Sequence, residues 1–82
     1  MEELLKYIIS NIVSDPAELK IETENIGDDI YYYIKVPEKE RGIIIGKEGK
    51  NIKSIRNLMT IIAKKQNKRV FVKIRDDEPV NL

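Results

Sequence analysis

The N-terminal part of the chain spaces its apolar side chains in two different ways. Apolar residues first recur at steps of three and four, which predicts an amphipathic helix, at Leu4, Leu5, Ile8, Ile9, Ile12 and Val13. Pro16 disfavours helical backbone at Asp15, so we expect the helix to end there. Residues 17–25 then alternate between apolar and charged side chains from Leu19 and Ile21 onwards, which predicts a strand with one solvated face.

A turn and a second strand follow. Residues 25–29 are rich in turn-forming side chains, among them Gly27. Residues 30–36 are dominated by Tyr and Ile, which favour strands, and Pro37 ends the run. The two strands are therefore expected to pair as an antiparallel hairpin.

The C-terminal half reads as two helices and a strand. Between residues 38 and 49 we expect a short helix that leads into a glycine-containing loop. Residues 50–66 form an amphipathic pattern in which Ile61 lies off the main apolar arc. The members of that arc are Ile52, Ile55, Leu58, Met59 and Ile62. Residues 69–75 alternate again, which predicts a strand with Val70 facing inward and Phe71 outward.

The predicted order is therefore α-β-β-α-α-β. Three amphipathic helices and three one-sided strands bury their apolar faces best as an α+β, two-layer sandwich with the helices on one face of the sheet. The helical pair forms a crossover between the second and third strands, so these strands are expected to be parallel neighbours in a three-stranded mixed sheet. Residues 1–75 are expected to form a single domain, and residues 76–82 an acidic flexible tail.

Composition removes several classes of function. The 82 residues contain no Cys and no His, so a disulfide framework, a thiolate metal site and the commonest general base are all absent. Solubility explains the acidic pairs at residues 28–29 and 76–77 better than acid–base catalysis does. We therefore assign no catalytic residue, metal ligand or cofactor and predict that the protein is not an enzyme. No apolar run reaches the length of a membrane span, and the acidic start at Glu2 and Glu3 is unlike a signal peptide, so a cytoplasmic protein is expected.

Charge is divided unevenly along the chain. Residues 1–40 carry ten acidic and four basic residues, whereas residues 41–75 carry eleven basic residues and Glu48 as the single acid. Such a division favours binding of a polyanion to one part of the surface. A solvated charged face explains it equally well at this stage.

The basic part contains a glycine loop, Gly46-Lys47-Glu48-Gly49, that joins the two expected helices. Each glycine permits positive φ and close approach of the backbone, and a helix whose first N–H groups can hold a phosphate starts directly afterwards. Lys47 adds charge at the loop. Taken alone, such a loop is more often a tight turn between helices. A nucleotide-binding P-loop is excluded because only three residues separate Gly42 from Gly46 and Glu48 follows Lys47.

The residues around the loop carry a more specific signal. The string Ile44-Ile45-Gly46-Lys47-Glu48-Gly49-Lys50-Asn51-Ile52-Lys53-Ser54-Ile55 closely resembles the signature of the KH domain, in which a G-x-x-G loop clamps the backbone of about four nucleotides. The resemblance covers essentially the whole chain and is strongest to the type II, bacterial arrangement, in particular to stand-alone KH proteins of the KhpA type. It implies a non-catalytic protein that binds single-stranded RNA.

The resemblance also implies roles for individual residues. Gly46, Lys47, Glu48 and Gly49 would form the backbone clamp, and Lys50, Lys53 and Arg56 would contact the RNA backbone or groove. Ile44, Ile45 and Ile52 would line the base-facing groove or support it from the core, and the sequence does not separate these roles. Glu48 in the loop, with Asp28 and Asp29 in the hairpin turn that we match to the loop flanking the groove, should weaken binding.

Other apolar residues suggest a protein interface. Tyr31, Tyr33 and Phe71 should lie on the face of the sheet opposite the helices, where ordinary cross-strand packing is the simpler explanation. Ile61, beside a polar helix face, is a second candidate for a protein contact. A homodimer is plausible on these grounds, and the resemblance implies a larger KH-containing partner of the KhpB or Jag type.

Three functions thus remain open. The first is an RNA chaperone or post-transcriptional regulator, which the family resemblance links to cell growth, shape and division. The second is a KH-like scaffold that works through protein contacts, and the third is binding of single-stranded DNA.

Overall fold

The computed structural model describes residues 1–76 and confirms the predicted element order. The helices are α1 (Glu2–Ser10), α2 (Glu38–Ile45) and α3 (Lys50–Lys65), and the strands are β1 (Lys20–Ile26), β2 (Asp29–Val36) and β3 (Arg69–Asp76). Two single turns of 3₁₀ helix, η1 (Pro16–Glu18) and η2 (Lys47–Gly49), precede β1 and α3. The flexible tail predicted for residues 76–82 lies, apart from Asp76 in β3, outside the described residues.

The sheet is mixed, as predicted. Its strand order is β1-β2-β3, with β1 antiparallel and β3 parallel to the central strand β2. The hairpin closes through the two residues Gly27 and Asp28, because Ile26 pairs with Asp29. Gly27 has a φ of +60°, as the first position of a two-residue hairpin turn of type II′ requires. The turn is therefore shorter than the five residues expected.

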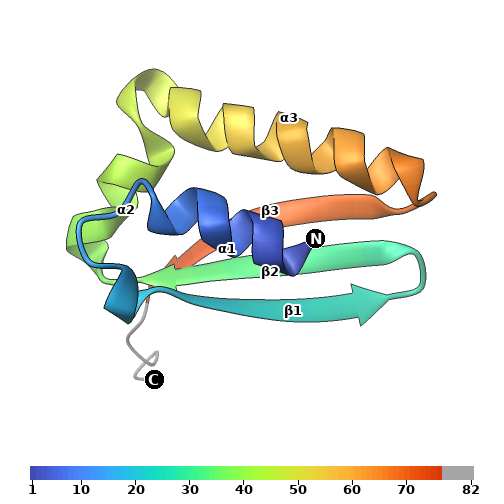
Figure 1. Cartoon of the computed structure of the whole chain (residues 1–82), viewed down its shortest axis with the longest axis horizontal. Helices are drawn as coiled ribbons and strands as arrows, with labels where there is room; N and C mark the ends of the chain where they lie inside the picture. The colour runs from blue at the N-terminus through green and yellow to red at the C-terminus, as the bar shows by residue number, and fades with distance from the viewer. Residues whose placement is uncertain (77–82) are drawn as a thin grey trace.

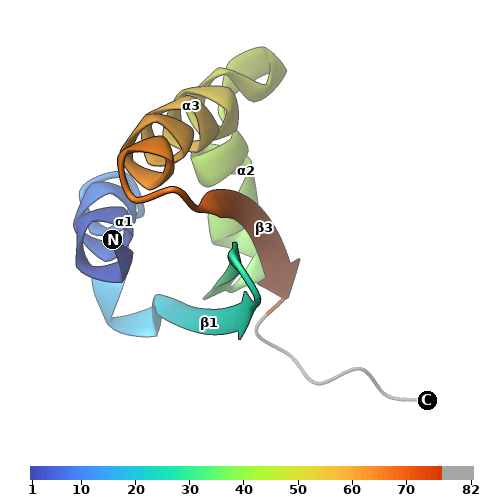
Figure 2. The same cartoon turned by 90° about the vertical axis from the view of Figure 1, so that its right-hand side faces the viewer.

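All three helices lie on one face of the sheet. α1 and α3 run side by side above the strands, and α2 closes one end of the layer (Figure 1). In the end-on view, no helix or strand of residues 1–76 covers the other face of the sheet (Figure 2). The molecule thus has a packed helical layer and an open sheet surface.

The hydrophobic core lies between the two layers. β2 alternates strictly between buried and half-buried residues, which is the pattern expected of a central strand with one covered face. The buried side chains are Leu5, Ile9, Val13, Leu19, Ile30, Tyr32, Ile34, Val36, Ile44, Ile52, Ile55, Met59 and Val72.

Two boundaries and one core assignment differ from the sequence prediction. α1 ends at Ser10, and Ile12 and Val13 lie in the following turn, where they still pack on the core. Strand β1 begins at Lys20 because Pro16 starts the turn η1, whose N-terminus is capped by the Asp15 side chain. Leu58 was placed in the apolar arc of α3 but is 42% exposed, because it lies on the side of that arc that faces the groove beside α1.

The C-terminus of α3 is set by local backbone chemistry. Asn67 adopts a left-handed φ of +57°, and its N–H donates to the carbonyl of Lys64. The N–H of Lys68 donates to the carbonyl of Ala63, which completes a Schellman motif. This stop directs the chain straight into β3.

A buried carboxylate joins the N-terminal segment to α2. Glu40 is 3% exposed, and its Oε2 accepts hydrogen bonds from the backbone N–H groups of Ser14, at 2.6 Å, and Asp15, at 3.3 Å. Since a buried carboxylate persists only with such partners, Glu40 fixes the position of α2 relative to the turn after α1.

Candidate nucleic-acid interface

The glycine loop between α2 and α3 has an unusual backbone. Three of its four residues have positive φ: Gly46 at +76°, Glu48 at +58° and Gly49 at +75°. Gly46 combines that φ with a ψ of 172°, a region that only glycine occupies readily. Glu48, in contrast, is a non-glycine residue held in the left-handed helical region.

Gly46 is also held by close packing against α3. A Cβ atom at this position would stand 2.6 Å from the side-chain Cγ of Asn51 and 2.9 Å from its backbone nitrogen. Asn51 cannot retreat freely, because its Nδ2 donates a 2.9 Å hydrogen bond to the carbonyl of Ile43 in α2. This close packing of Gly46 against Asn51 therefore fixes how near α2 and α3 approach each other on either side of the loop.

The loop presents both amide groups and ammonium groups. Its own hydrogen bonds run from Gly46 N–H to the Gly42 carbonyl, from Gly49 N–H to Gly46, and from Lys50 N–H to Lys47. None of these uses the N–H groups of Lys47 and Glu48. The side chains of Lys47, Lys50 and Lys53 are exposed, and the Lys53 stem lies 3.8 Å from where a Cβ on Gly49 would stand. Such a concave turn of amides with flanking lysines is suited to an anion such as a phosphate.

The three isoleucines near the loop occupy different depths. Ile44 is fully buried and Ile52 is 7% exposed, and both belong to the core cluster. Ile45 is half-buried and packs against that cluster from outside. The sequence left open whether these isoleucines line the groove or support it from the core. The positions of Ile44 and Ile52 fit support from the core, whereas Ile45 is partly accessible.

Arg56 points from α3 toward the sheet. Its Nε donates a 3.1 Å hydrogen bond to the Val72 carbonyl on the free edge of β3. A groove of about 250 Å³ lies along this edge, between α3 and β3. Its lining residues are Arg56, Thr60, Val70, Phe71, Val72 and Lys73. Lys50 and Lys53 precede Arg56 on α3, so basic residues run from the loop to this groove.

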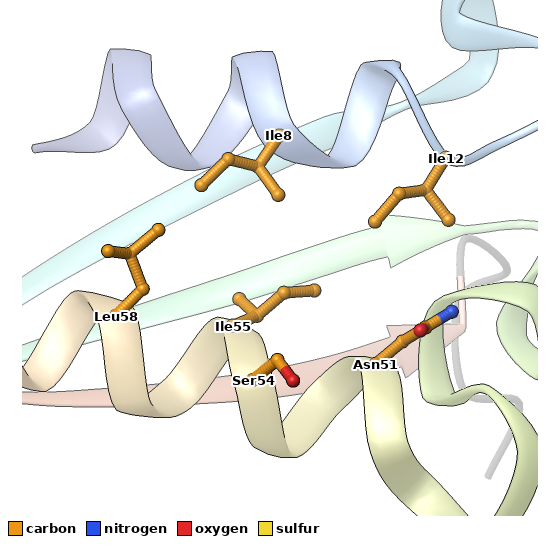
Figure 3. Close-up of a pocket in the computed structure, with 6 residues that line it drawn as sticks. All are labelled: Ile8, Ile12, Asn51, Ser54, Ile55 and Leu58. Carbon is orange, nitrogen blue, oxygen red and sulfur yellow. The ribbon is translucent and has the colours of Figure 1, made fainter.

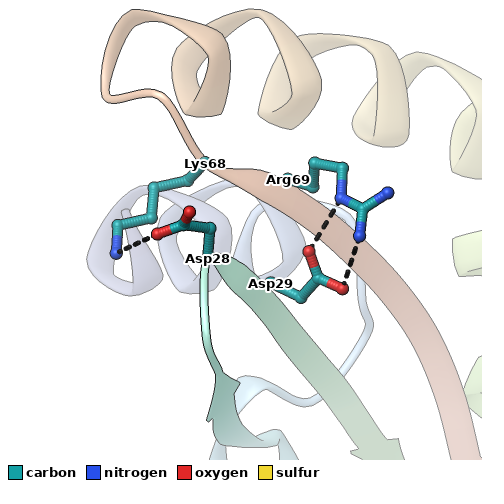
Figure 4. A network of polar contacts seen from close by, with 4 residues as sticks. All are labelled: Asp28, Asp29, Lys68 and Arg69. Atoms are coloured by element: carbon teal, nitrogen blue, oxygen red, sulfur yellow. Dashed lines mark hydrogen bonds and ion pairs between the residues drawn. The ribbon is translucent and has the colours of Figure 1, made fainter.

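The acidic residues of the hairpin are paired with bases rather than free. Arg69 holds Asp29 through two hydrogen bonds, Nε to Oδ1 at 2.8 Å and Nη2 to Oδ2 at 2.9 Å, and Lys68 lies 3.8 Å from Asp28 (Figure 4). The hydrogen bonds that Arg69 donates to Asp29 raise the pKa of its guanidinium. Because both carboxylates have a basic partner, they repel a nearby phosphate less than the sequence suggested.

The open face of the sheet carries the predicted aromatic residues. Tyr31 stacks on Phe71 with ring centroids 4.9 Å apart, and on Tyr33 with centroids 6.4 Å apart. The guanidinium of Arg75 lies 3.7 Å from the centre of the Tyr33 ring, close enough for a cation–π contact. The predicted cross-strand packing is confirmed for Tyr31 and Phe71, whereas Tyr33 neighbours Tyr31 along the same strand. Phe71 remains 37% exposed.

A second, apolar groove separates α1 from α3. Ile8 and Ile12 face Ile55 and Leu58 across it, and Asn51 and Ser54 lie at its α3 border (Figure 3). It encloses about 220 Å³. Ile61 is 56% exposed in the next turn of α3, as its place beside the polar face predicted.

Comparison with known proteins decides the family. The KhpA/KhpB KH-domain family matches residues 2–74. The chain belongs to this family. Its relatives include "RNA-binding protein KhpA" of Chlamydia pneumoniae, 40% identical over 95% of this chain and the whole of that one. The protein of the same name from Clostridium acetobutylicum is 35% identical over 90% of this chain and 99% of that one. These KhpA proteins are named for RNA binding and not as enzymes, in agreement with the prediction of a non-catalytic protein.

Solved structures confirm the KH-like fold of this KhpA/KhpB family member. Era from Aquifex aeolicus bound to GDP.AlF4- aligns over 90% of this chain, with 21% identity and a TM-score of 0.63. Era in complex with MgGDPNP and nucleotides 1506–1542 of 16S ribosomal RNA aligns with a TM-score of 0.59 and 22% identity. The chain spans 29% and 28% of these two Era chains, so the likeness concerns one domain of each.

Residues 1–76 contain neither a cluster of metal ligands nor a membrane-spanning helix. No group of three or more acidic side chains is arranged there to hold a metal ion. No helix in that range combines the length and the apolar character that crossing a bilayer requires.

The sequence placed a base-facing groove at Ile44, Ile45 and Ile52, and it did not indicate the lining of either groove observed. Arg56 was expected to contact RNA directly, and its hydrogen bond to the β3 edge depends on how α3 crosses the sheet. The groove between α1 and α3 depends in the same way on helix packing, although the exposed positions Leu58 and Ile61 lie at its side of α3.

Proposed function

We propose that the protein binds single-stranded RNA without catalysing a reaction. The observation that supports this proposal is the structure of the glycine loop. The loop's own hydrogen bonds leave the N–H groups of Lys47 and Glu48 unused, and three lysines surround the turn. Two or more phosphates of a nucleic-acid backbone match this set of donors better than a single small anion does, because the charges are spread along α3. The KhpA relatives are named for the same ligand.

The bases have a place beside the clamped backbone. A strand held at the loop and extended along α3 would lay its bases over the groove between α3 and β3. Arg56 and Lys73 border that groove, and the half-buried Val70 provides apolar surface for an unstacked base. Ile44 and Ile52 hold the loop from below, and Ile45 adds half-buried apolar surface near Gly46.

We favour RNA over single-stranded DNA as the ligand because the KhpA relatives are named for RNA binding. No contact specific for RNA supports this choice. A phosphate clamp holds either backbone, and only a contact to the 2′-hydroxyl distinguishes them. Titration of both kinds of oligonucleotide therefore belongs to the first experiment.

That experiment is fluorescence anisotropy with short labelled RNA and DNA oligonucleotides at two salt concentrations. We expect the double variant Lys47→Asp/Glu48→Asp to reduce affinity at least tenfold, because the loop then repels phosphates. The matched control is Glu38→Asp/Lys39→Asp, which makes the same two substitutions at exposed positions of α2 and should bind as the wild type does. Equal binding by all three proteins, or none by the wild type, would leave the loop as a turn and favour a protein-interaction scaffold.

The role in the cell follows from weak binding by one small module. A single groove and four-residue clamp give modest affinity, so the protein would act as a post-transcriptional regulator or RNA chaperone together with a second copy or a larger KH-containing protein of the KhpB or Jag type. The family resemblance would place that activity in the control of cell growth, shape and division.

A protein contact is proposed for the surface around Ile61. This side chain and Leu58 are exposed apolar residues of α3 beside the groove against α1. We expect Ile61→Asp to weaken self-association in sedimentation velocity, because a carboxylate cannot be buried unpaired at an interface. Thr60→Asp is the control, since Thr60 lines the other groove, beside β3. A monomeric wild type, or equal loss in both variants, would contradict a dimer through this surface.

A further inference from the structure

The uncovered face of the sheet is an aromatic surface rather than a uniformly polar one. Tyr31 and Phe71 are paired directly across β2 and β3, and Tyr33 follows on the same face of β2. Their rings are nearly parallel, with interplanar angles of 17° and 11°. Parallel rings on an open sheet present faces and edges on which planar groups can stack.

Charge on this face increases from one edge of the sheet to the other. β1 contributes Glu22 and Glu24 together with Lys20, whereas β3 contributes Arg69, Lys73 and Arg75. The hydrogen bond and charge of Lys35, 2.6 Å away, lower the pKa of Glu22, and Arg75 adds to the effect. Two bases are thus neutralised, because Lys35 holds Glu22 and Arg69 holds Asp29.

Lys73 and Arg75 therefore give the β3 side of this face its positive charge. The ion pairs found within residues 1–76 include neither of them. Arg75 lies over Tyr33, and Lys73 is the register partner of that tyrosine. The aromatic stack therefore has a basic border on β3 and an acidic border on β1, which favours a polyanion that approaches from the β3 edge.

The same edge already belongs to the groove proposed for bases. Phe71 and Lys73 are members of both surfaces, because they project to the open face from β3 and also line the groove between α3 and β3. A strand that leaves this groove would thus meet Phe71 and then the Tyr31 ring stacked on it, with no break in the positive border.

We propose that the open sheet face is a second binding site for single-stranded nucleic acid, entered over the β3 edge. One or two bases stack on the exposed Phe71 ring and the half-buried Tyr31 ring, and Lys73 and Arg75 contact the adjoining phosphates. The proposal rests on the RNA-binding function proposed above and extends it from the four nucleotides of the loop and groove to a longer strand. Stacking of this kind tolerates any base, so the site raises the affinity for longer strands without selecting a base sequence.

The test compares two lengths of oligouridine, four and ten nucleotides, by fluorescence anisotropy. Tyr31→Leu keeps apolar bulk on the sheet but removes the ring, so we expect it to lower affinity for the ten-nucleotide RNA about fivefold to tenfold. The four-nucleotide RNA should bind unchanged, because Tyr31 lies outside the groove between α3 and β3. The matched control is Tyr7→Leu, which removes a 68% exposed ring from α1 and should change neither. Circular dichroism checks that both variants stay folded.

A second variant tests the phosphate contact without altering the rings. Lys73→Gln should reduce the slope of log affinity against log salt by about 0.7 for the ten-nucleotide RNA. Lys6→Gln on α1 is its control and should leave the slope unchanged.

The outcomes separate this proposal from the one on which it rests. If wild type binds four nucleotides but gains nothing from ten, or if Tyr31→Leu keeps the full gain, the second site is refuted while the loop clamp stands. If neither length binds wild type, both proposals fail. If Tyr31→Leu leaves RNA binding intact and reduces self-association in sedimentation velocity, the aromatic face is a protein interface instead.

Discussion

Replacing Gly46 with alanine is expected to abolish RNA binding and to destabilise the fold by about 2–4 kcal/mol. The φ of +76° with ψ of 172° is a backbone conformation from which any Cβ is excluded, independently of the surroundings. The Cβ would in addition approach Asn51 to 2.6 Å, and the atoms it meets include backbone, which cannot rotate away. Relief requires α3 to move, which also breaks the hydrogen bond from Asn51 to Ile43.

Gly49→Ala is the matched comparison for this prediction. Gly49 has almost the same φ, +75°, but a Cβ there would meet nothing closer than the Cε of Lys53 at 3.8 Å. Its cost is therefore the left-handed conformation alone, about 1–2 kcal/mol. Urea denaturation followed by circular dichroism gives both free energies of unfolding, and anisotropy gives both affinities. Equal losses in the two variants would show that the contact with Asn51 does not hold the loop.

The element order could be predicted because each element carries its own local pattern. Residues 69–75 alternate with period two, and residues 30–36 are rich in Tyr and Ile. Residues 50–66 follow a helical period closely enough that the observed helix ends one residue earlier. The parallel arrangement of β2 and β3 followed from the helical crossover between them. These are local patterns and a connection rule, and neither depends on side-chain contacts between distant residues.

The parts that failed depend on contacts that no local pattern encodes. Apolar spacing extended the first helix to Val13, but the chain must turn after Ser10 to reach Glu40, whose carboxylate binds the N–H groups of Ser14 and Asp15. The spacing likewise placed Leu58 in the apolar arc of the helix, whereas the packing of α1 beside α3 leaves it at the side of a groove. Periodicity identifies the apolar face of a helix, but not which part of that face a neighbour covers.

The predictions for the site residues show the same difference between local patterns and contacts of distant residues. The loop motif indicated where phosphates would bind, and its positive φ values agree with the need for glycine at positions 46 and 49. The sequence could not assign Ile44 to the core or orient Arg56 toward the Val72 carbonyl, because both depend on the packing of α2 and α3 against the sheet. It also treated Asp28 and Asp29 as free charges, although the bases that pair with them follow about forty residues later.

Glu40→Ala is expected to lower the free energy of unfolding by about 2–3 kcal/mol, because two part-buried backbone donors then lose a charged acceptor. The variant should also lose stability locally, in the segment that Glu40 holds. Residues 11–15 form the only covalent connection from α1 to the η1 turn, and Glu40 is their tie to α2. Hydrogen exchange should therefore show faster exchange of the Ser14 and Asp15 amides than of the core strand β2.

Two companion variants separate the charge from the helix itself. Glu38→Ala removes an exposed carboxylate from the first turn of the same helix and should cost well under 1 kcal/mol. Glu40→Gln retains one oxygen that can accept from Ser14 but loses the charge that strengthens both bonds, so it should fall between wild type and Glu40→Ala. If Glu40→Ala and Glu38→Ala unfold at the same urea concentration, the carboxylate of Glu40 is a spectator, and the position of α2, and with it the glycine loop, is set by the core packing of Ile44 alone.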